Sequence, residues 1–272
     1  MPELPEVETI RRGVTPHILG RRIEQVVVRE RRLRWPVPDG LDTRLPGQTV
    51  TATHRRGKYL IITLDSGDRL MVHLGMSGRL FVLTPDTPLR KHDHVDLRFD
   101  GEVLLRLQDP RRFGALLLWP AGETGHPLLD HLGPEPFDPA FDGTYLFRRS
   151  RRRTGPVKSF LMDGETVVGC GNIYAAESLF RAGIRPTRPA GRVTRREYEA
   201  LATAVRTVLE EAVIQGGTTL RDFAGAHGES GYFQQDLYVY GRDGEPCRIC
   251  DRLIRPGRIG QRASCYCPGC QK

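Results

Sequence analysis

Lysine, cysteine and long apolar runs are all scarce in this chain of 272 residues. No apolar run approaches the ~18 residues that a membrane-spanning helix needs, and no apolar signal sequence follows Met1. We therefore expect a cytoplasmic protein with no membrane contact. Only four of the 41 basic residues are lysines, so a lysine that is retained in this arginine-rich chain is a candidate for function, Lys58 and Lys158 before the others.

Six cysteines are present, and four of them form two Cys-x2-Cys pairs. The spacing is typical of a zinc ribbon, and four thiolates leave no open position for water, so we expect one structural Zn²⁺ ion and no metal catalysis. The intervening residues predict a β-hairpin that turns at Pro256-Gly257. Cys170 and Cys265 remain as free thiols. The expected ligands are Cys247, Cys250, Cys267 and Cys270.

Positive charge dominates the chain, with a net charge of +8 and a pI of about 9.4. A basic chain without a membrane segment indicates a polyanionic partner, with nucleic acid first. The arginine run at residues 148–153 fits either a solvated surface or a phosphate contact.

Short strands and tight turns are the main pattern of the first half. A helix begins at Pro5 and is broken at Pro16 and Gly20, and strands follow, with hairpin turns at residues 65–68 and at Asp100-Gly101. This combination predicts an antiparallel sandwich with the helix packed on it. The expected strands are residues 23–29, 49–54, 59–64, 69–73, 95–99, 102–107 and 115–119.

Helical spacing dominates the second half. Asn172 is suited to cap one helix, and Thr194 with Glu197 forms a capping box for another, which we expect to end at Gly216-Gly217. Residues 218–235 show no clear period and predict a long loop after a short helical piece.

Pro2 and the two acids near it are the first candidate for chemistry. If Met1 is removed, Pro2 becomes a terminal secondary amine, and unprotonated amines attack electrophilic carbon. At pH 7.4 roughly a fifth of an ordinary α-amine is unprotonated, against roughly a thousandth of a lysine. Glu3 and Glu6 lie on one face of the following helix and can move protons. Taken alone, these residues favour an ordinary charged helix start.

Six motifs in collinear order change this interpretation. Together they resemble the formamidopyrimidine-DNA glycosylases, bacterial enzymes that repair oxidised purines in DNA. The similarity extends from Pro2 to Lys272. The motifs are MPELPEVET with RRGV at residues 1–14, HLGMSG at 73–78, KHDH at 91–94, DPRRFG at 109–114, GNIYA at 171–175 and the four-cysteine tail.

The resemblance implies an α+β fold of two domains. The first is an antiparallel β-sandwich with an N-terminal helix, and the second is a helical domain with a helix-two-turn-helix element and a zinc-ribbon β-hairpin. Residues 120–145 are rich in Pro, Gly and Asp and indicate a linker between the domains. We place the boundaries at residues 1–132 for the sandwich, 133–149 for the linker, 150–240 for the helix-two-turn-helix domain and 241–272 for the zinc finger.

The resemblance also implies a reaction on duplex DNA. The nitrogen of Pro2 would attack C1′ of the damaged nucleotide, which is flipped into a pocket between the domains, and the resulting iminium would allow β- and δ-elimination. Glu3 would move protons, and Glu6 would orient the terminus. Lys58 would contact phosphate and assist base release, and Arg262 would contact phosphate near the damaged nucleotide.

The implied DNA contacts come from both halves of the chain. An apolar side chain, a guanidinium and an aromatic ring would fill the gap left by the flipped base, and other residues would grip the backbone. Residues 217–232 would close over the lesion. We expect a monomer that acts on nucleoid DNA containing oxidised purines or abasic sites. The gap-filling residues are Met76, Arg111 and Phe113, and the remaining DNA contacts are His92, Lys158 and Asn172.

Two alternatives are kept open. An endonuclease VIII-like enzyme for oxidised pyrimidines shares the terminal proline and the zinc finger, although Leu4 and the DPRRFG loop argue against it. A non-catalytic zinc-ribbon protein that binds DNA would explain the charge and the cysteines but would leave Pro2 and Glu3 without a role.

Overall fold

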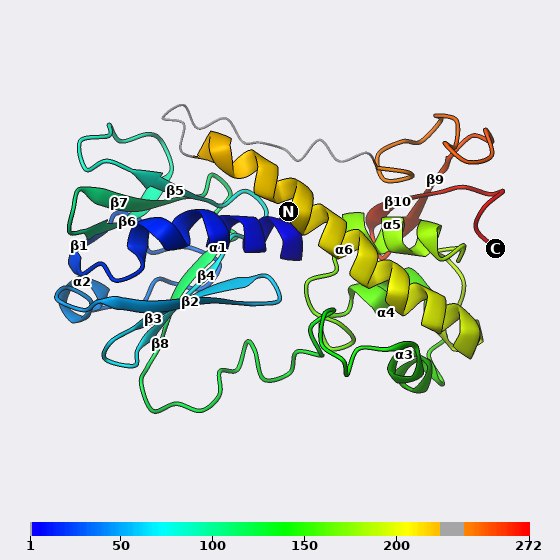
Figure 1. The fold of residues 1–272 in the computed structure, drawn as a ribbon, viewed down its shortest axis with the longest axis horizontal. Helices are drawn as coiled ribbons and strands as arrows, with labels where there is room; N and C mark the ends of the chain where they lie inside the picture. Colours follow the sequence, from blue (N-terminus) through cyan, green and yellow to red (C-terminus); the bar gives the residue numbers. More distant parts are fainter. Residues whose placement is uncertain (1, 224–236) are drawn as a thin grey trace. The chain divides into compact units, whose positions relative to one another are not determined.

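The computed structural model describes the backbone of residues 2–223 and 237–272, and the side chains of residues 2–216 and 237–272. The chain divides into two compact units (Figure 1). The first holds residues up to Asp130 together with the end of the longest helix from Gln215, and the second begins at His131 and includes the C-terminal residues.

Two four-stranded antiparallel sheets form the predicted sandwich in the first unit. Their strand orders are β1-β6-β7-β5 and β2-β3-β4-β8. Apolar side chains of both sheets share one core, with Ile62 and Leu70 from one sheet and Leu97 and Leu105 from the other. The strands are β1 (Ile23–Val28), β2 (Val50–Arg56), β3 (Tyr59–Leu64), β4 (Arg69–His73), β5 (Arg79–Leu83), β6 (Asp93–Phe99), β7 (Val103–Gln108) and β8 (Ala115–Trp119).

Helix α1 (Leu4–Ile18) packs on the sandwich and contacts β2, β3 and β5. Its buried stripe includes Val7, Val14 and Ile18. The expectation that Pro16 breaks this helix is wrong, since Pro16 lies inside the last turn. A proline there removes one backbone donor but leaves the preceding turns intact.

The predicted hairpin turns are present in the first unit. Gly67 (φ 85°) lies in the turn between β3 and β4, and Gly101 (φ 69°) with Glu102 (φ 60°) lies between β6 and β7. Strand β5 escaped prediction because it is an edge strand in which only Leu80 is buried, so its sequence shows no clear alternation. A short helix, α2 (Leu41–Arg44), was also not predicted.

The second unit is helical, as expected. The Thr194–Glu197 capping box is confirmed, since the Thr194 N–H donates to Glu197 Oε2 at 2.8 Å and the Glu197 N–H donates to Thr194 Oγ1 at 3.3 Å. Asp142 caps a further helix within the expected linker by accepting from the Tyr145 N–H at 2.6 Å. The helices are α3 (Gly143–Ser150), α4 (Val157–Met162), α5 (Asn172–Arg181) and α6 (Arg195–Phe223), with a short 3-10 helix at Ala190–Arg192.

The expected end of α6 at Gly216-Gly217 is wrong, because the helix continues to Phe223. Glycine inside a helix costs about 1 kcal/mol relative to alanine but does not force an end. Of the expected lesion-covering segment, residues 217–232, only the backbone up to Phe223 is described, and the remainder lies outside the described residues.

The C-terminal residues form the predicted hairpin of β9 (Arg255–Ile259) and β10 (Arg262–Tyr266). The predicted turn position is wrong, since Pro256 and Gly257 lie within β9. The chain turns instead at Gly260 (φ 53°) and Gln261 (φ 62°). Two successive residues with positive φ match the right-handed twist of a hairpin. The residue before a proline, here Arg255, instead favours extended backbone, which suits a strand.

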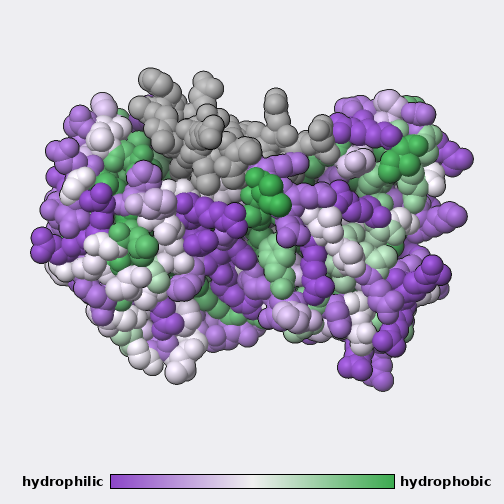
Figure 2. Space-filling view, in the orientation of Figure 1, coloured by the Kyte–Doolittle hydropathy of each residue, from purple (hydrophilic) through white to green (hydrophobic). Residues whose placement is uncertain are grey.

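No helix among the described residues is long and apolar enough to cross a membrane. The face shown in Figure 2 is mostly hydrophilic, with hydrophobic areas that are small and separate from one another.

Glu177 of α5 anchors the segment that leads into the zinc ribbon. Its buried carboxylate accepts three backbone N–H bonds, from Tyr238 at 2.9 Å, Val239 at 3.0 Å and Tyr240 at 2.8 Å. A carboxylate that is removed from water requires such donors. This one side chain of α5 therefore holds three consecutive residues, 238–240, against the helix.

We predict that Glu177→Ala lowers the free energy of unfolding of the second unit by roughly 2–4 kcal/mol, because the buried Val239 N–H would lose its acceptor at a cost of about 1–3 kcal/mol and the half-buried N–H groups of Tyr238 and Tyr240 would lose less each. Amide hydrogen exchange should become faster at residues 238–240 first. Glu210→Ala, which removes an exposed acid of α6, is the control. Unchanged protection at residues 238–240 in Glu177→Ala would contradict the prediction.

Candidate functional site

Pro2, Glu3 and Glu6 lie together at the start of α1. The Glu3 N–H donates to Glu6 Oε2 at 2.7 Å, and the Glu3 side chain accepts from the Glu6 N–H, so the two acids form a reciprocal capping box. Glu3 is only 2% exposed, whereas Pro2 is half-buried. The helix start thus holds two carboxylic acids that closely follow Pro2 in the sequence, and carboxylates can orient an amine and move its proton.

Lys58 lies in the turn between β2 and β3, directly after Gly57, whose φ of 55° the turn requires. It is half-buried near His73 of β4. Burial first, and then the positive charges of Lys58 and Arg34, lower the pKa of His73 to about 4. The imidazole is therefore neutral at pH 7.

The neutral ring of His73 has two contacts. Its Nδ1 accepts from the Gly75 N–H at 3.1 Å, and its ring centroid lies 4.9 Å from that of Tyr59, its partner in the β3–β4 register. His73 therefore links the strand next to the Lys58 turn with the loop that carries Met76. His73 begins the HLGMSG motif but was not among the predicted site residues.

Asp109 joins the two loops that carry the expected gap-filling residues. Its carboxylate is fully buried and accepts from Ser77 Oγ at 2.6 Å, from the Gly114 N–H at 2.7 Å and from the Arg111 N–H at 3.3 Å. Gly75 permits the close approach of the loops, because a Cβ there would lie 2.3 Å from the Phe113 carbonyl carbon. The acid and the glycine together fix one loop against the other.

The joined loops expose two apolar side chains. Met76 is 46% exposed and Phe113 is 43% exposed. The Arg111 guanidinium lies 4.7 Å from the centre of the Phe113 ring, whereas Arg112 (φ 57°) pairs with Glu30 at 3.5 Å. Of the two adjacent arginines, Arg111 is thus the one that is placed with the exposed aromatic ring.

His92 lies beside the Asp109 loop in the first unit. Its φ is 73°, and its carbonyl accepts from the Asp109 N–H at 3.1 Å. The half-buried imidazole lies 6.2 Å from the ring of His94.

Lys158 and Asn172 both bind strand β10 within the second unit. Lys158 is 1% exposed and its Nζ donates to Ser264 Oγ at 3.0 Å, while Asn172 Nδ2 donates to the Ala263 carbonyl at 3.1 Å. Arg262, which directly precedes Ala263 at the start of β10, is exposed. The structure therefore brings three of the residues singled out in the sequence to one place.

The predicted cap at the start of α5 is corrected by the structure. Gly171 occupies the cap position, and Asn172 is the first helical residue. Asn172 uses its side chain for the distant β10 carbonyl, a contact that spans 91 positions and has no local signal in the sequence.

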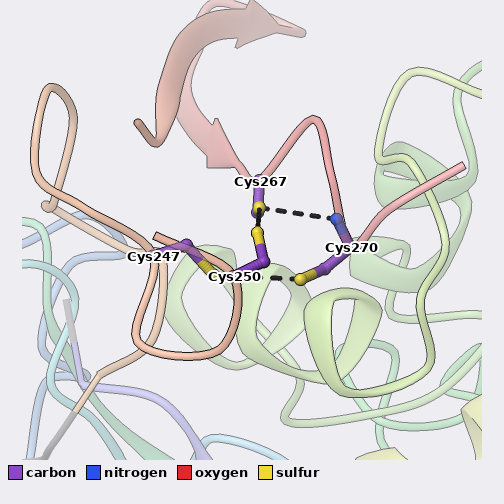
Figure 3. Close-up of side chains that lie close together, drawn as sticks. All are labelled: Cys247, Cys250, Cys267 and Cys270. Atoms are coloured by element: carbon purple, nitrogen blue, oxygen red, sulfur yellow. Dashed lines mark hydrogen bonds between the residues drawn. The ribbon is translucent and has the colours of Figure 1, made fainter. Parts of the chain in front are cut away.

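The four cysteines of the tail point toward one another (Figure 3). Their sulfurs all lie within 4.8 Å of one another, with Cys247 and Cys270 at 3.8 Å and Cys250 and Cys267 at 3.4 Å. A tetrahedral zinc with bonds of about 2.3 Å sets its sulfurs roughly 3.8 Å apart, so the four residues fit a metal ion. Cys265 is buried in the neighbouring apolar cluster and is not part of this group.

Comparison with known proteins gives the family. Residues 1–116 match the family model of the formamidopyrimidine-DNA glycosylase N-terminal domain, and residues 132–224 match that of the H2TH domain. A formamidopyrimidine-DNA glycosylase of Stenotrophomonas maltophilia is 58% identical over 272 residues, all of both chains. The chain belongs to the formamidopyrimidine-DNA glycosylase family.

Solved structures of this family share the fold. A Lactococcus lactis mutant enzyme in complex with DNA containing Fapy-dG superposes with a TM-score of 0.90 at 33% identity, over 100% of both chains. The Lactococcus lactis enzyme bound noncovalently to DNA with an abasic site gives 0.89 at 32% identity, over 99% of both chains.

We predict that His73 makes the stability of this formamidopyrimidine-DNA glycosylase family member fall between pH 6.5 and pH 4. The folded pKa of about 4 lies below the ordinary 6.5, so the unfolded chain takes up the proton first. The contribution is complete above pH 6.5 and is lost as the pH falls toward 4. A gap of about 2.5 pH units corresponds to roughly 3 kcal/mol.

The measurement is urea unfolding followed by tryptophan fluorescence, because Trp35 and Trp119 both belong to the first unit. His73→Asn should flatten the pH dependence, since the amide oxygen can replace Nδ1 as an acceptor and does not titrate. His54→Asn, at an exposed position, is the control. The same pH dependence in wild type and His73→Asn would exclude this role.

Proposed function

We propose that the chain is a bifunctional DNA glycosylase and abasic-site lyase that removes oxidised purines from duplex DNA. Family membership over the whole chain supports this function. Complexes of similar proteins with Fapy-dG and abasic-site DNA support the substrate class. The observation that carries the mechanism is the start of α1, where two acids that hydrogen-bond to each other's backbone closely follow Pro2 in the chain.

The proposed reaction starts after removal of Met1. The lone pair of the Pro2 nitrogen attacks C1′ of the damaged nucleotide, the bond from C1′ to the base breaks with a proton delivered to the leaving base, and the nitrogen loses its own proton. The bond from C1′ to O4′ then breaks as O4′ takes up a proton, which opens the sugar ring and leaves C1′ joined to Pro2 as an iminium. The resulting iminium acidifies C2′, so loss of a C2′ proton expels the 3′ phosphate, and a second elimination expels the 5′ phosphate. Glu3 moves protons in these steps, and Glu6 orients the terminus through the Glu3 N–H.

In this proposal, residues of both units contact DNA. Met76, Phe113 and Arg111 fill the gap that the flipped base leaves, since two are exposed apolar groups and the third stacks on one of them. Lys58 contacts phosphate and assists base release. His92 contributes a further contact from the Asp109 loop.

In the second unit, Lys158 and Asn172 hold β10, so that the exposed Arg262 and the start of α5 meet phosphate together. Backbone N–H groups at a helix start favour an anion. Direct phosphate contact by the buried Lys158 remains a prediction. We also infer that the metal is zinc and that it is structural, since four thiolates leave no open position. The proposed place of action is chromosomal DNA.

The experiment that tests this function uses a duplex with one 8-oxoguanine opposite cytosine. The proposal expects base release and cutting on both sides of the sugar, with an undamaged duplex left intact. A duplex with an oxidised pyrimidine tests the endonuclease VIII-like alternative, which expects faster cutting there. Binding without cutting of any damaged duplex would leave only the non-catalytic zinc-ribbon interpretation.

We predict that one residue added before Pro2 abolishes base release and strand cutting, because the nitrogen becomes an amide without a free lone pair. Binding to a duplex with an uncleavable abasic analogue should persist, since the phosphate contacts are unchanged. Mass spectrometry establishes that the added residue is intact. Normal turnover by the extended protein would exclude Pro2 as the nucleophile.

We predict that Cys267→Ser loses the metal whereas Cys265→Ser retains it, because only Cys267 belongs to the four-sulfur group. Metal content per chain is measured directly by elemental analysis. The first variant should lose DNA binding while the tryptophan fluorescence of the first unit stays native. Loss of metal from Cys265→Ser would contradict the assigned ligand set.

A further inference from the structure

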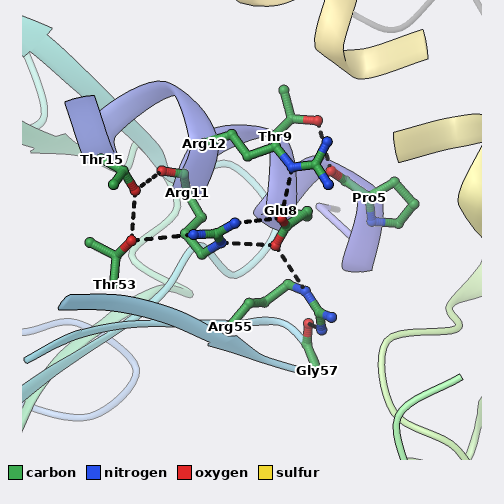
Figure 4. A network of polar contacts seen from close by, with 9 residues as sticks. All are labelled: Pro5, Glu8, Thr9, Arg11, Arg12, Thr15, Thr53, Arg55 and Gly57. Atoms are coloured by element: carbon green, nitrogen blue, oxygen red, sulfur yellow. Dashed lines mark hydrogen bonds and ion pairs between the residues drawn. The ribbon is translucent and has the colours of Figure 1, made fainter. Parts of the chain in front are cut away.

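A chain of polar contacts in the first unit connects α1 with the turn that carries Lys58 (Figure 4). Arg55 of β2 lies at its centre. Its Nε lies 3.4 Å from Glu8 Oε2 in α1, and its Nη1 donates to the Gly57 carbonyl at 3.0 Å. Gly57 directly precedes Lys58, so one guanidinium contacts both the helix and the turn.

The contact between Arg55 and the helix is an ion pair whose two side chains are largely buried. The side chains of Arg55 and Glu8 are 10% and 13% exposed. Glu8 also accepts from Arg11 at 2.7 Å and from Arg12 at 2.8 Å. Burial alone would raise the pKa of Glu8, but the hydrogen bonds from Arg11 and Arg12 outweigh it and lower that pKa. The carboxylate is therefore charged at neutral pH and able to hold Arg55.

The same helix also contacts the strand through hydroxyl groups. Arg11 reaches Thr53 Oγ1 at 3.4 Å, and Thr15 Oγ1 lies 2.6 Å from Thr53 Oγ1 (Figure 4). These contacts lie farther from the start of α1 than Glu8 does. They fix the helix on β2 but do not contact the turn.

We propose that Arg55 is a positioning residue: it fixes the position of Lys58 relative to Pro2, and its ion pair with Glu8 attaches it to the helix. The nucleophile lies at the start of α1 and Lys58 follows the turn residue Gly57, so the arginine that contacts helix and turn fixes the distance between them. This inference rests on the proposed function. It adds a residue for which the motifs assign no role in catalysis.

The inference predicts an unequal effect on the two activities. Lys58 is proposed to assist base release, and abasic DNA has no base to release. A displaced Lys58 should therefore slow excision of 8-oxoguanine by roughly 10- to 100-fold, the usual effect of a displacement near 1 Å. Cutting of abasic DNA should change by less than about threefold.

The test compares four variants with the wild type. Arg55→Lys keeps a charge for Glu8 but lacks the planar fork that also reaches the Gly57 carbonyl. Arg12→Met is the matched control, since Arg12 pairs with the same carboxylate but its side chain is 48% exposed and has no bond to the turn. Lys58→Ala and the double variant Arg55→Lys/Lys58→Ala complete a double-mutant cycle.

Three results together support the inference. Arg55→Lys loses excision but keeps most abasic-site cutting, Arg12→Met behaves as wild type, and the double variant is no slower than Lys58→Ala alone. Multiplicative losses in the double variant would show that Arg55 does not act through Lys58. Equal losses on both substrates with a lowered melting temperature would assign Arg55 to the fold alone.

One further result separates this inference from the proposed function. Full excision by Lys58→Ala would overturn the inference, because Lys58 would then have no role for Arg55 to support. Borohydride should still trap the wild-type protein covalently on 8-oxoguanine DNA in that case, because trapping depends on Pro2. Absence of trapping in the wild type would instead overturn the proposed function, and the inference with it.

Discussion

A carboxylate that leaves water must be matched by hydrogen-bond donors, and this constraint places the candidate site residues in both units. Asp109 matches its two oxygens with a hydroxyl and backbone N–H groups, and thereby joins the loops that expose Met76 and Phe113. Glu8 pairs with arginines of both α1 and β2, and Glu177 accepts hydrogen bonds from three backbone N–H groups that precede the zinc ribbon. Each acid thereby connects segments that are distant from one another in the sequence.

The parts of the fold that follow local rules could be predicted from the sequence. Hairpin turns at Gly67 and Gly101 need a positive φ, which glycine supplies, and the strands beside them are runs of mostly buried residues. The capping box at Thr194 depends only on a residue three positions away. Two Cys-x2-Cys pairs predict their own clustering, because metal ligation needs little besides the spacing.

The features that could not be predicted depend on contacts between residues that are distant in sequence. Asn172 has the residue type of a cap, but its amide donates to a carbonyl 91 positions away. Glu8 lies in α1 and Arg55 in β2, and no sequence motif connects them, whereas Glu177 has the residue type of an ordinary helix position. A proline and a glycine at residues 256–257 suggested the turn of the zinc hairpin, yet the strand continued through them because Gly260 and Gln261 provided the turn.

Both activities of the proposed function depend on a covalent bond between DNA and a single amine, the nitrogen of Pro2. The most direct test is to trap the wild-type protein on 8-oxoguanine DNA with borohydride, digest the complex and locate the attached sugar by mass spectrometry. We predict attachment on the N-terminal peptide, at Pro2. Attachment at Lys58, Lys158 or any other amine would contradict this assignment.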